Sequence, residues 1–524
     1  MVPRCGLSRQ FTDSDAVSAS CIVVLGGGTA GWMTACLMAK AWPAADITVV
    51  ESPEIGIVGV GEGSTPQLKG FFDTLGIAEA EWMPRCNATY KTGIAFHGWS
   101  ERPGYTSYFH PFPTALDGFT TPHFYAAALA RRQGANAEAH PDRFFLPAYL
   151  ARHGKAPLAA DNFPFDIAYG YHFDAHLIGT FLAEHATKQL GVRHLARRVI
   201  HVEQSDDGAV AALLLDGDER LTGEFFVDAS GFRALLAVEA LEVPFRSFGD
   251  NLFNDRAVVM PTAADPLSTP SMTTATALGA GWAWAIPLRN RTGNGYVYAS
   301  RYIEADAAEV ALRAHLGMLD SPVTARHLTM RVGRLETSWT KNVLAVGLAQ
   351  GFLEPLEATA LHIVQTTVES FIRAYPGGGC ETTSRDLFNA QVGARYEGVR
   401  DYIVAHYKLN QRSDTAYWRD NASHHQLSDS LKAILTCWYT GKDLTAEIAA
   451  QDIARYYAPT SWYCLLAGYG TFPLEGRLRP EATAAVSLTQ IDDFLERCGR
   501  NFRDHHTALS SRNVWWSREV SRFV

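Results

Sequence analysis

A glycine-rich turn near the N-terminus has the residue types and the spacing that phosphate binding requires. The segment CIVVLGGGTAG reads as a short β-branched strand, then Gly26-x-Gly28-x-x-Gly31, then the start of a helix. Gly26 permits a tight turn, Gly28 lets the backbone approach a pyrophosphate, and Gly31 lets the helix pack closely on the strand. The N–H groups at the start of that helix are free to bind phosphate oxygens.

An acidic residue stands where such a turn needs a partner for a ribose. A second expected strand, 47–50, ends at Glu51, twenty residues after Gly31, where a carboxylate would accept hydrogen bonds from the ribose 2′-OH. A lone GxGxxG is often an ordinary turn, but here strand, helix and acid occur together. The segment FVDASGF, 226–232, is typical of the second strand and turn beside FAD in flavoproteins. No second GxGxxG follows a strand, so the sequence favours FAD without a nicotinamide site.

One lysine, Lys91, lies in a segment that is more apolar than the surroundings of an exposed lysine usually are. Lys91 is surrounded by Tyr90, Ile94, Phe96 and Trp99, which indicates a largely buried environment. An exposed lysine is usually solvated surface, whereas a buried one without a role is costly. Its ammonium group offers three hydrogen-bond donors on a flexible stem, which makes Lys91 a candidate catalytic donor.

A glutamate at an expected helix start is a second candidate. Glu357 follows Pro355, and a carboxylate at this position could take up a proton. The alternative is a first-turn glutamate that only favours the helix dipole. Both roles are compatible, because the same helix start offers the N–H groups of Thr359 and Ala360 to an anion.

Four motifs, in order along the chain, resemble those of the flavin-dependent halogenases, and of the tryptophan-halogenase group in particular. The segment GWAWAIP, 281–287, matches the WxWxIP signature, and IGIVGVGEGSTP, 55–66, resembles the flavin strap. NATYKTGIAF, 87–96, resembles the catalytic-lysine segment, and GFLEPLEATA, 351–360, the segment with the glutamate and the halide site. The resemblance extends over nearly the whole chain and includes SWYCLLAGYG at 461–470.

The resemblance implies an α/β fold with a Rossmann-like FAD-binding core of the GR2 flavoprotein monooxygenase type and a mainly helical C-terminal part. It implies a two-component enzyme that uses FADH₂, O₂ and chloride or bromide to form hypohalous acid and halogenate an electron-rich aromatic. A separate NAD(P)H-dependent flavin reductase would supply the FADH₂. Lys91 would hold the hypohalous acid, and Glu357 would act on the cationic intermediate. FAD would contact Gly26, Gly28, Thr29, Ala30, Gly31, Glu51, Ser52, Val60, Gly63, Val199, Leu348 and Leu361.

The halide site departs from the family's usual pattern. The resemblance assigns it to Thr359 and Ala360, but Ala360 replaces the common glycine and Ala358 replaces a serine. A backbone contact survives the change from glycine to alanine only if φ stays negative at that position. The preference between chloride and bromide therefore stays open.

The substrate residues implied by the resemblance are His110, Phe112, Trp282, Trp284 and Trp462. Trp282 and Trp284 would form the wall between flavin and substrate, although most tryptophans are core residues. Family members acting on free tryptophan hold its amino-acid end with a Tyr-Tyr pair followed by a glutamate. The corresponding stretch here is Trp438-Tyr439 with Glu447. Because this match is imperfect, the expected substrate is an indole, a tryptophan-like molecule or another electron-rich arene.

Two other functions remain as alternatives. The first is an aromatic monooxygenase on the same fold, but such hydroxylases usually carry Gly-Asp where this chain has Gly347-Leu348, and they lack WxWxIP. The second is a flavin-binding protein without turnover, against which the intact Lys91 and Glu357 argue.

The elements that must position these residues follow from pattern. Residues 54–130 read as long loops with short helices, and residues 250–350 as short strands alternating with turns. From Glu357 onward the pattern is helical, and apolar residues at 388, 392, 396, 399, 403 and 407 stack on one helical face. We expect an FAD-binding core over 20–375, with interleaved substrate-side elements, and a helical substrate-binding part over 376–524.

Composition narrows the class of protein further. The net charge of −9, from 46 Lys+Arg and 55 Asp+Glu, argues against nucleic acid as the main partner. The eight cysteines contain no CxxC, and no histidine pair has metal-ligand spacing, so we expect reduced thiols and no metal site. The first twenty residues lack the apolar core of a signal peptide, and no apolar run is long enough for a membrane span. The sequence predicts a cytoplasmic protein, with a homodimer left open.

Overall fold

The computed structural model describes residues 21–54, 61–375, 382–479 and 488–510. Val60, expected to contact FAD, lies outside these ranges. Within them, no helix combines the length and the apolar composition needed to cross a membrane. The six cysteines in these ranges are free thiols, as their sequence pattern predicts.

A six-stranded sheet carries the glycine-rich turn. Its strands lie in the order β21 (Trp339–Thr340), β22 (Val343–Ala345), β13 (Phe225–Asp228), β1 (Cys21–Leu25), β2 (Asp46–Glu51) and β9 (Arg193–Ala196). All neighbours pair in parallel except β21 and β22. Alternate residues of β1 enter different cores: Ile22 and Val24 pack with α1, and Val23 and Leu25 with β11. The expected βαβ unit and the strand in FVDASGF are confirmed.

A seven-stranded sheet carries the tryptophan motif. Its order is β19 (Arg326–Thr329), β15 (Arg256–Ala263), β18 (Arg291–Tyr298), β17 (Gly281–Pro287), β16 (Thr273–Leu278), β5 (Gly93–His97) and β6 (Ser107–Pro111). On β17, Trp282, Trp284 and Ile286 belong to the main core, whereas Ala283 belongs to a smaller cluster. The strand alternation therefore directs both tryptophans to the same side of the sheet.

Four smaller sheets complete the β structure. They are β3 (Glu62–Gly63), β8 (Gly170–Phe173) and β4 (Thr89–Lys91); β10 (Val199–Gln204), β11 (Val210–Leu215) and β12 (Arg220–Thr222); β14 (Phe245–Ser247), β20 (Gly333–Leu335) and β23 (Gly351–Phe352); and β7 (Lys155–Ala159) with β24 (Phe502–Asp504). The first of these brings Gly63 and Lys91 onto the two edges of β8.

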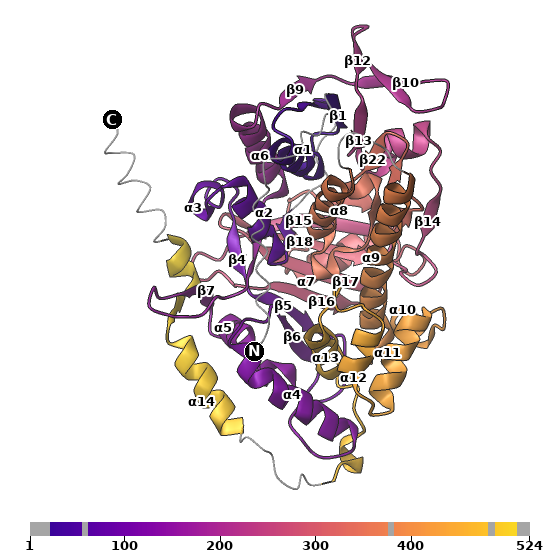
Figure 1. Ribbon diagram of the computed structural model, residues 1–524. Coiled ribbons are helices and arrows are strands. Elements are labelled where there is room, and N and C mark those ends of the chain that lie inside the picture. The colour runs from indigo at the N-terminus through magenta and orange to yellow at the C-terminus, as the bar shows by residue number, and fades with distance from the viewer. Residues whose placement is uncertain (1–20, 55–60, 376–381, 480–487, 511–524) are drawn as a thin grey trace, which may run out of the picture.

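The helices lie around the sheets, and the C-terminal ones gather at one end (Figure 1). They are α1 (Thr29–Ala41), α2 (Gln67–Leu75), α3 (Glu79–Trp82), α4 (Asp117–Arg132), α5 (Leu146–Arg152), α6 (Ala175–Gln189), α7 (Ala305–His315), α8 (Ala360–Ala374), α9 (Thr382–Lys408), α10 (Ala416–Ser423), α11 (Asp429–Tyr439), α12 (Leu444–Ala450), α13 (Pro459–Gly468) and α14 (Leu488–Gly499). One hydrophobic core runs from β1 to α13, so the two expected parts of the chain share it.

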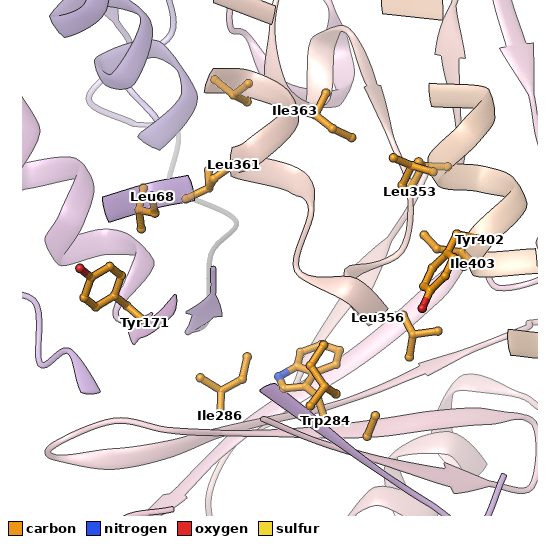
Figure 2. Close-up of a cluster of buried hydrophobic side chains, with 14 of the residues drawn as sticks. Leu68, Tyr171, Trp284, Ile286, Leu353, Leu356, Leu361, Ile363, Tyr402 and Ile403 are labelled. Carbon is orange, nitrogen blue, oxygen red and sulfur yellow. The ribbon is translucent and has the colours of Figure 1, made fainter. Parts of the chain in front are cut away.

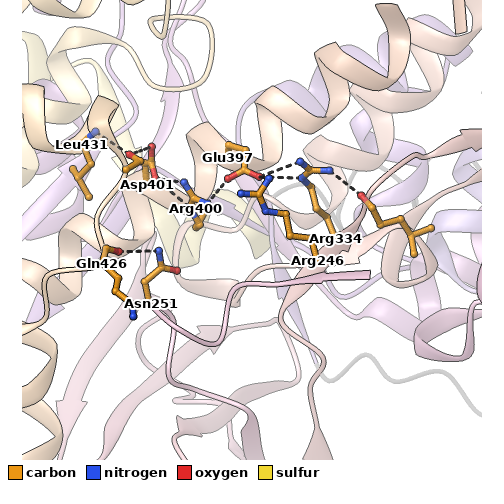
Figure 3. A network of polar contacts seen from close by, with 10 residues as sticks. Arg246, Asn251, Arg334, Glu397, Arg400, Asp401, Gln426 and Leu431 are labelled. Carbon is orange, nitrogen blue, oxygen red and sulfur yellow. Dashed lines mark hydrogen bonds and ion pairs between the residues drawn. The ribbon is translucent and has the colours of Figure 1, made fainter. Parts of the chain in front are cut away.

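Long helix α9 confirms the predicted apolar stripe, whose six residues are all buried. Its opposite face is held by charge (Figure 3). Glu397 contacts Arg334 and Arg246 from the β14–β20–β23 sheet, as well as Arg400 on its own helix. These ion pairs join the charged face of α9 to the β14–β20–β23 sheet. The apolar face of the helix therefore packs toward the core.

Two expectations were wrong in detail. Residues 54–130 include the 16-residue α4, in which Pro122 lies inside the helix, and strands β5 and β6 of the large sheet. Proline there reads as a helix breaker, but α4 continues through it at the cost of the one hydrogen bond that an N–H at position 122 would donate to the Gly118 carbonyl. Residues 250–350 include the 11-residue helix α7, which the strand pattern of its neighbours concealed.

Candidate active site

The turn after β1 has the shape that a pyrophosphate needs. Gly26 has a φ of 116°, and a methyl group added there would lie 2.2 Å from the carbonyl oxygen of Ala229. A methyl group at Gly31 would lie 1.9 Å from the carbonyl oxygen of Gly26. At Gly28, by contrast, an added methyl meets nothing within 4 Å, so the backbone faces open space. The three glycines thus have the separate roles that the motif predicts.

The helix that follows leaves its N–H groups available. No side chain caps α1, because the N-cap residue is Gly28, and no acidic residue lies in its first turn. The Thr29 hydroxyl donates to the carbonyl of Ala175 at 3.2 Å. The Glu51 carboxylate lies against Gly27 and 2.8 Å from His194 Nε2. Uncapped N–H groups beside open space, with a carboxylate at the end of the next strand, fit a dinucleotide such as FAD.

The other residues expected at FAD divide into two groups. Ser52 directly follows β2, Val199 begins β10, and Leu348 lies just after β22, where neighbouring Gly347 faces Ala30. These three lie near the carboxyl ends of the parallel strands. Gly63 and Leu361 lie elsewhere, beside Lys91 and on α8 respectively.

Lys91 is fully buried, at 0% exposure, at the end of β4. Its Nζ has no hydrogen-bond partner among the described residues and lies 5.4 Å from the centre of the Phe112 ring. Burial lowers the pKa of Lys91 to about 7, and the Glu357 charge opposes part of this shift. A methyl group at Gly63 would lie 3.0 Å from Nζ, so glycine leaves the space beside the ammonium group open.

A buried polar network surrounds this lysine. The Thr89 hydroxyl donates to the carbonyl of Pro287 at 2.7 Å, so its oxygen accepts from His172 Nδ1 at 3.0 Å. His172 Nε2 then accepts from the Thr273 hydroxyl at 2.9 Å. Burial, with the Lys91 charge, holds the pKa of His172 well below its usual range. Thr89 thus joins β4 to the end of the WxWxIP strand, and the neutral His172 joins β4 to Thr273 on β16, links that no sequence pattern indicates.

Glu357 is buried in a short 3₁₀ turn, Pro355–Glu357, before α8. Its Oε1 lies 2.8 Å from His406 Nε2 on α9 and 3.4 Å from His110 Nδ1 on β6. Neither contact has the geometry of a hydrogen bond. Burial by itself raises the pKa of Glu357, but the two imidazoles outweigh it and hold this pKa at about 2. The residue is therefore a carboxylate of low basicity.

The proposed halide residues lie directly after this glutamate. Thr359 precedes α8 without a side-chain cap, and no acidic residue lies in the first turn. Ala360 is the first residue of the helix, where φ is negative, so its methyl group meets the condition stated above. Ala358 has a φ of 54°, a left-handed conformation that is costly for alanine. This backbone turns sharply between the carboxylate and the candidate anion site.

The two tryptophans of β17 have different surroundings. Trp282 is buried and donates through Nε1 to Glu354 at 3.0 Å, and Glu354 also accepts from Asn254 and the Tyr407 hydroxyl. Burial raises the pKa of Glu354 against these hydrogen bonds. Sequence reasoning missed Glu354, although it lies in the same motif as Glu357.

Trp284 stands on the same side of the sheet with Ile286, facing Leu361 and Leu356 (Figure 2). Its ring packs over Gly295, whose missing side chain leaves the space, and its Nε1 has no partner in the described part of the chain. Trp462 lies 4.8 Å from Tyr402, edge to face, and its Nε1 is likewise without a described partner. Two of the indole N–H groups expected at the substrate therefore have no hydrogen-bond partner among the described residues.

The stretch with Trp438, Tyr439 and Glu447, an imperfect match to the family's amino-acid clamp, has other contacts. Trp438 is a core residue that donates to the Thr471 carbonyl, Tyr439 is 63% exposed, and Glu447 accepts from Gln451. The chain has another adjacent pair, Tyr456-Tyr457, and Tyr457 stacks on Tyr402 at 3.6 Å. The next glutamate after that pair is Glu475, which pairs with Arg131 instead. Two adjacent tyrosines in the sequence are the pattern by which this pair could have been predicted.

The parallel sheet, its glycine turn and the adjoining large sheet define a flavoprotein of the GR2 monooxygenase type. The sequence pattern of the family described as tryptophan halogenase matches residues 21–484. The 7-chloro-L-tryptophan 6-halogenase KtzR of Kutzneria sp. (strain 744) is 36% identical, over 89% of this chain and 93% of that protein. The tryptophan 6-halogenase SttH from Streptomyces toxytricini has a crystal structure with a TM-score of 0.81 and 34% identity, over 94% of this chain and 99% of that one.

BrvH, a flavin-dependent halogenase from Brevundimonas sp. BAL3, has a TM-score of 0.80 and 31% identity, over 94% of this chain and 98% of that one. The chain therefore belongs to the tryptophan halogenase family, and it is a flavin-dependent halogenase. The expected fold, including the helical C-terminal part, is confirmed by these structural neighbours.

Proposed function

We propose that this enzyme halogenates an electron-rich aromatic, an indole or a tryptophan-like molecule, with Lys91 and Glu357 as its catalytic residues. The observation that carries the proposal is a buried lysine without a described partner, whose pKa the charge of the buried Glu357 carboxylate raises against the effect of burial. Reduced FAD, when bound, supplies with O₂ the two-electron oxidation of a halide to hypohalous acid. Overall, one arene C–H, one halide, O₂, FADH₂ and a proton give the aryl halide, FAD and two waters.

Lys91 holds the oxidant beside the arene. Its Nζ donates a proton toward the oxygen of the hypohalous acid, which polarises the oxygen–halogen bond. As the halogen bonds to the ring carbon, that oxygen leaves as water. The buried position of Nζ keeps competing solvent away from the donor.

Glu357 stabilises the positive charge that develops on the ring. A carboxylate whose pKa is about 2 is a weak base, so electrostatic stabilisation fits it better than early proton removal. The N–H groups of Thr359 and Ala360 hold the halide, and the glycine turn with Glu51 holds the nucleotide end of FAD. His110, Phe112, Trp284 and Trp462 border the arene, and Trp282 backs this wall through Glu354.

A separate NAD(P)H-dependent flavin reductase supplies the FADH₂. This step rests on the lack of a second glycine fingerprint in the sequence. We place the reaction in the cytoplasm, where reduced nicotinamide and free thiols are both maintained.

The test is incubation with FAD, a flavin reductase, NADH, O₂, bromide and indole, followed by mass spectrometry of the products. A product with the bromine isotope pair is expected. A gain of one oxygen would instead identify a hydroxylase, and no product would identify a flavin-binding protein without turnover. The Lys91→Ala variant is the control, because bromination by hypobromous acid free in solution would persist in it.

A further inference from the structure

A buried chain of hydrogen bonds fixes the direction in which the Thr273 hydroxyl donates. The chain ends at the Pro287 carbonyl, which can only accept, so it takes the proton of the Thr89 hydroxyl. The Thr89 oxygen then accepts from His172 Nδ1, and Nε2 of this neutral imidazole is left to accept from Thr273. Because the Thr273 proton is committed to His172, the Thr273 oxygen has a lone pair available to another donor.

Strand pairing places this hydroxyl on the same side of the large sheet as the tryptophans of β17. On β16, Ala275 lies opposite Trp284, and both residues belong to the main core. Thr273 precedes Ala275 by two residues on the same strand, so its side chain is on the same face. Thr273 is itself buried, with 8% of its surface exposed.

Lys91 and Thr273 border one small space in front of Gly63. A methyl group added to Gly63 would lie 3.0 Å from Lys91 Nζ and 3.3 Å from Thr273 Oγ1. The Lys91 ammonium has no hydrogen-bond partner among the described residues, and it can only donate. This space is therefore bordered by a donor without an acceptor and by an acceptor whose own proton is already used.

We propose that Thr273 is a further catalytic residue, whose hydroxyl oxygen accepts the O–H of the hypohalous acid that Lys91 holds. The inference rests on the proposed function, which places the oxidant at Lys91. Hypohalous acid carries one O–H, and a buried donor without an acceptor is costly. Lys91 cannot supply this acceptor, whereas Thr273 can. Two contacts hold the oxidant more tightly than one, and they fix the direction in which its halogen points.

The contact fits the balance of the halogenation step. As the oxygen–halogen bond breaks, the halogen bonds to the ring carbon and the oxygen leaves as water. That water keeps the O–H that faced Thr273 and takes its second proton from Lys91. The proton lost by the ring carbon restores the Lys91 ammonium, and Thr273 neither gains nor loses a proton.

The test separates oxidant held in the site from oxidant released into solution. Indole is brominated with FAD, a flavin reductase, NADH, O₂ and bromide, with and without an excess of an enolisable diketone that traps free hypobromous acid. In the wild type, we expect most of the brominated indole to form despite the trap. In Thr273→Val, this trap-resistant product per FADH₂ oxidised should fall roughly 3–10-fold, the scale of one hydrogen bond, and brominated diketone should rise.

Two further variants distinguish the hydroxyl from the shape of the side chain. Thr273→Ser keeps the hydroxyl and should retain the wild-type division between brominated indole and brominated diketone. Thr89→Val touches neither oxidant nor arene, but it removes the acceptor that fixes the His172 tautomer, so its division should lie between those of the wild type and Thr273→Val.

The matched control is Thr120→Val, which removes another buried hydroxyl, one that donates to the Asp117 carbonyl on α4, and should leave the division unchanged. FAD affinity and the denaturant midpoint of each variant are measured alongside, so that a folding defect is recognised. A wild-type division in Thr273→Val or in Thr89→Val, or its loss in Thr273→Ser, would overturn the inference alone. Absence of brominated indole from the wild type would instead contradict the proposed function.

Discussion

At the scale of single residues, the candidate site holds two opposite charges, Lys91 and Glu357, that are both buried and do not pair with each other. The Lys91 ammonium has no described acceptor, and Glu357 is held by His110 and His406 instead. A direct ion pair would keep Lys91 fully protonated and occupied. Because the charges are kept apart, Lys91 stays available to a ligand, and its pKa falls to about 7.

This pKa predicts how product yield depends on pH. Lys91 is protonated below about pH 7, and the proposed donor is its ammonium form. Brominated product per FADH₂ oxidised should therefore fall as the pH rises through about 7, while flavin oxidation itself should not follow that curve. Paired product and flavin assays from pH 5.5 to 9 measure this. A yield that rises with pH would make the neutral amine the reactive form.

Substitution separates the chemistry on the arene from the chemistry on the flavin. Lys91→Ala should be close to inactive, and Glu357→Gln should lose roughly 10²–10³-fold in halogenation, the scale of one electrostatic stabiliser. Both variants should still bind FAD and consume FADH₂, as measured by flavin absorbance beside product analysis. If Lys91→Ala stopped flavin oxidation, Lys91 would act at the flavin rather than at the substrate.

At the scale of elements, the short strand β4 is fixed by hydrogen bonds from several other segments of the chain. Tyr90 on β4, with Tyr169 and Tyr171, donates a hydroxyl to the Glu79 carboxylate. The Tyr90 N–H donates to His505 Nε2 at 3.2 Å, while His505 Nδ1 donates to the Thr269 carbonyl at 2.7 Å. The Tyr90 N–H thus donates to a histidine side chain rather than to a neighbouring strand. Because of these hydrogen bonds, the strand that carries Lys91 has little freedom to move.

His505 predicts a loss of stability in acid. Burial lowers the pKa of His505 to about 4, below the ordinary 6.5. The neutral imidazole is the form that accepts the hydrogen bond from the Tyr90 N–H. Between pH 6.5 and 4 the unfolded chain binds a proton that the folded chain does not, so stability falls as the pH falls. In His505→Gln, which can accept and donate without titrating, the slope should drop by up to about 1.4 kcal/mol per pH unit. Denaturant unfolding across this range tests it, and parallel slopes for the two proteins would contradict it.

The turn from β1 to α1 gives a prediction for the cofactor. The open space at Gly28 is where we place the pyrophosphate, so Gly28→Ala should weaken FAD binding by roughly tenfold or more, equal to 1.4 kcal/mol. Gly118→Ala on α4 is the control, because a methyl group there also meets nothing within 4 Å but lies far along the chain. Unchanged FAD affinity in Gly28→Ala, measured by fluorescence titration, would remove the pyrophosphate from this turn.

At the scale of the whole molecule, one core joins the flavin end to the substrate end. The helix α8 packs on α1 and carries the candidate halide site at its start, and α9 packs against α8. Both helices therefore connect the nucleotide turn with the surroundings of Glu357, and the charged contacts of Glu397 join α9 to the β14–β20–β23 sheet (Figure 3). The chain has no second glycine fingerprint to bind a nicotinamide.

Dependence on a reductase follows from that architecture. With NADH alone, the FAD-loaded protein should retain its visible flavin absorbance under anaerobic conditions for the length of an assay. Addition of a flavin reductase should remove this absorbance and, once air and bromide are admitted with indole, start product formation. Rapid bleaching by NADH alone would reveal a nicotinamide site that the sequence does not indicate.

The sequence by itself determined what depends on local order. The βαβ unit, its glycine roles, the α9 stripe and the burial of Lys91 follow from spacing and from neighbours within a few residues. Local patterns specify such features because strand alternation, helical periodicity and glycine dihedrals are set by adjacent residues. Helices α4 and α7 were missed for the same reason, since a proline or neighbouring strands concealed their periodicity.

Only the tertiary structure decided which distant residues meet. Glu357 contacts His110 and His406, His172 forms hydrogen bonds with Thr89 and Thr273, and Tyr457 rather than Tyr439 stacks on Tyr402. These partners lie tens to hundreds of residues apart, and no pattern in either segment encodes the other. The pKa values of the site depend on burial and on those contacts, so they exist only once the sheets and helices have packed together.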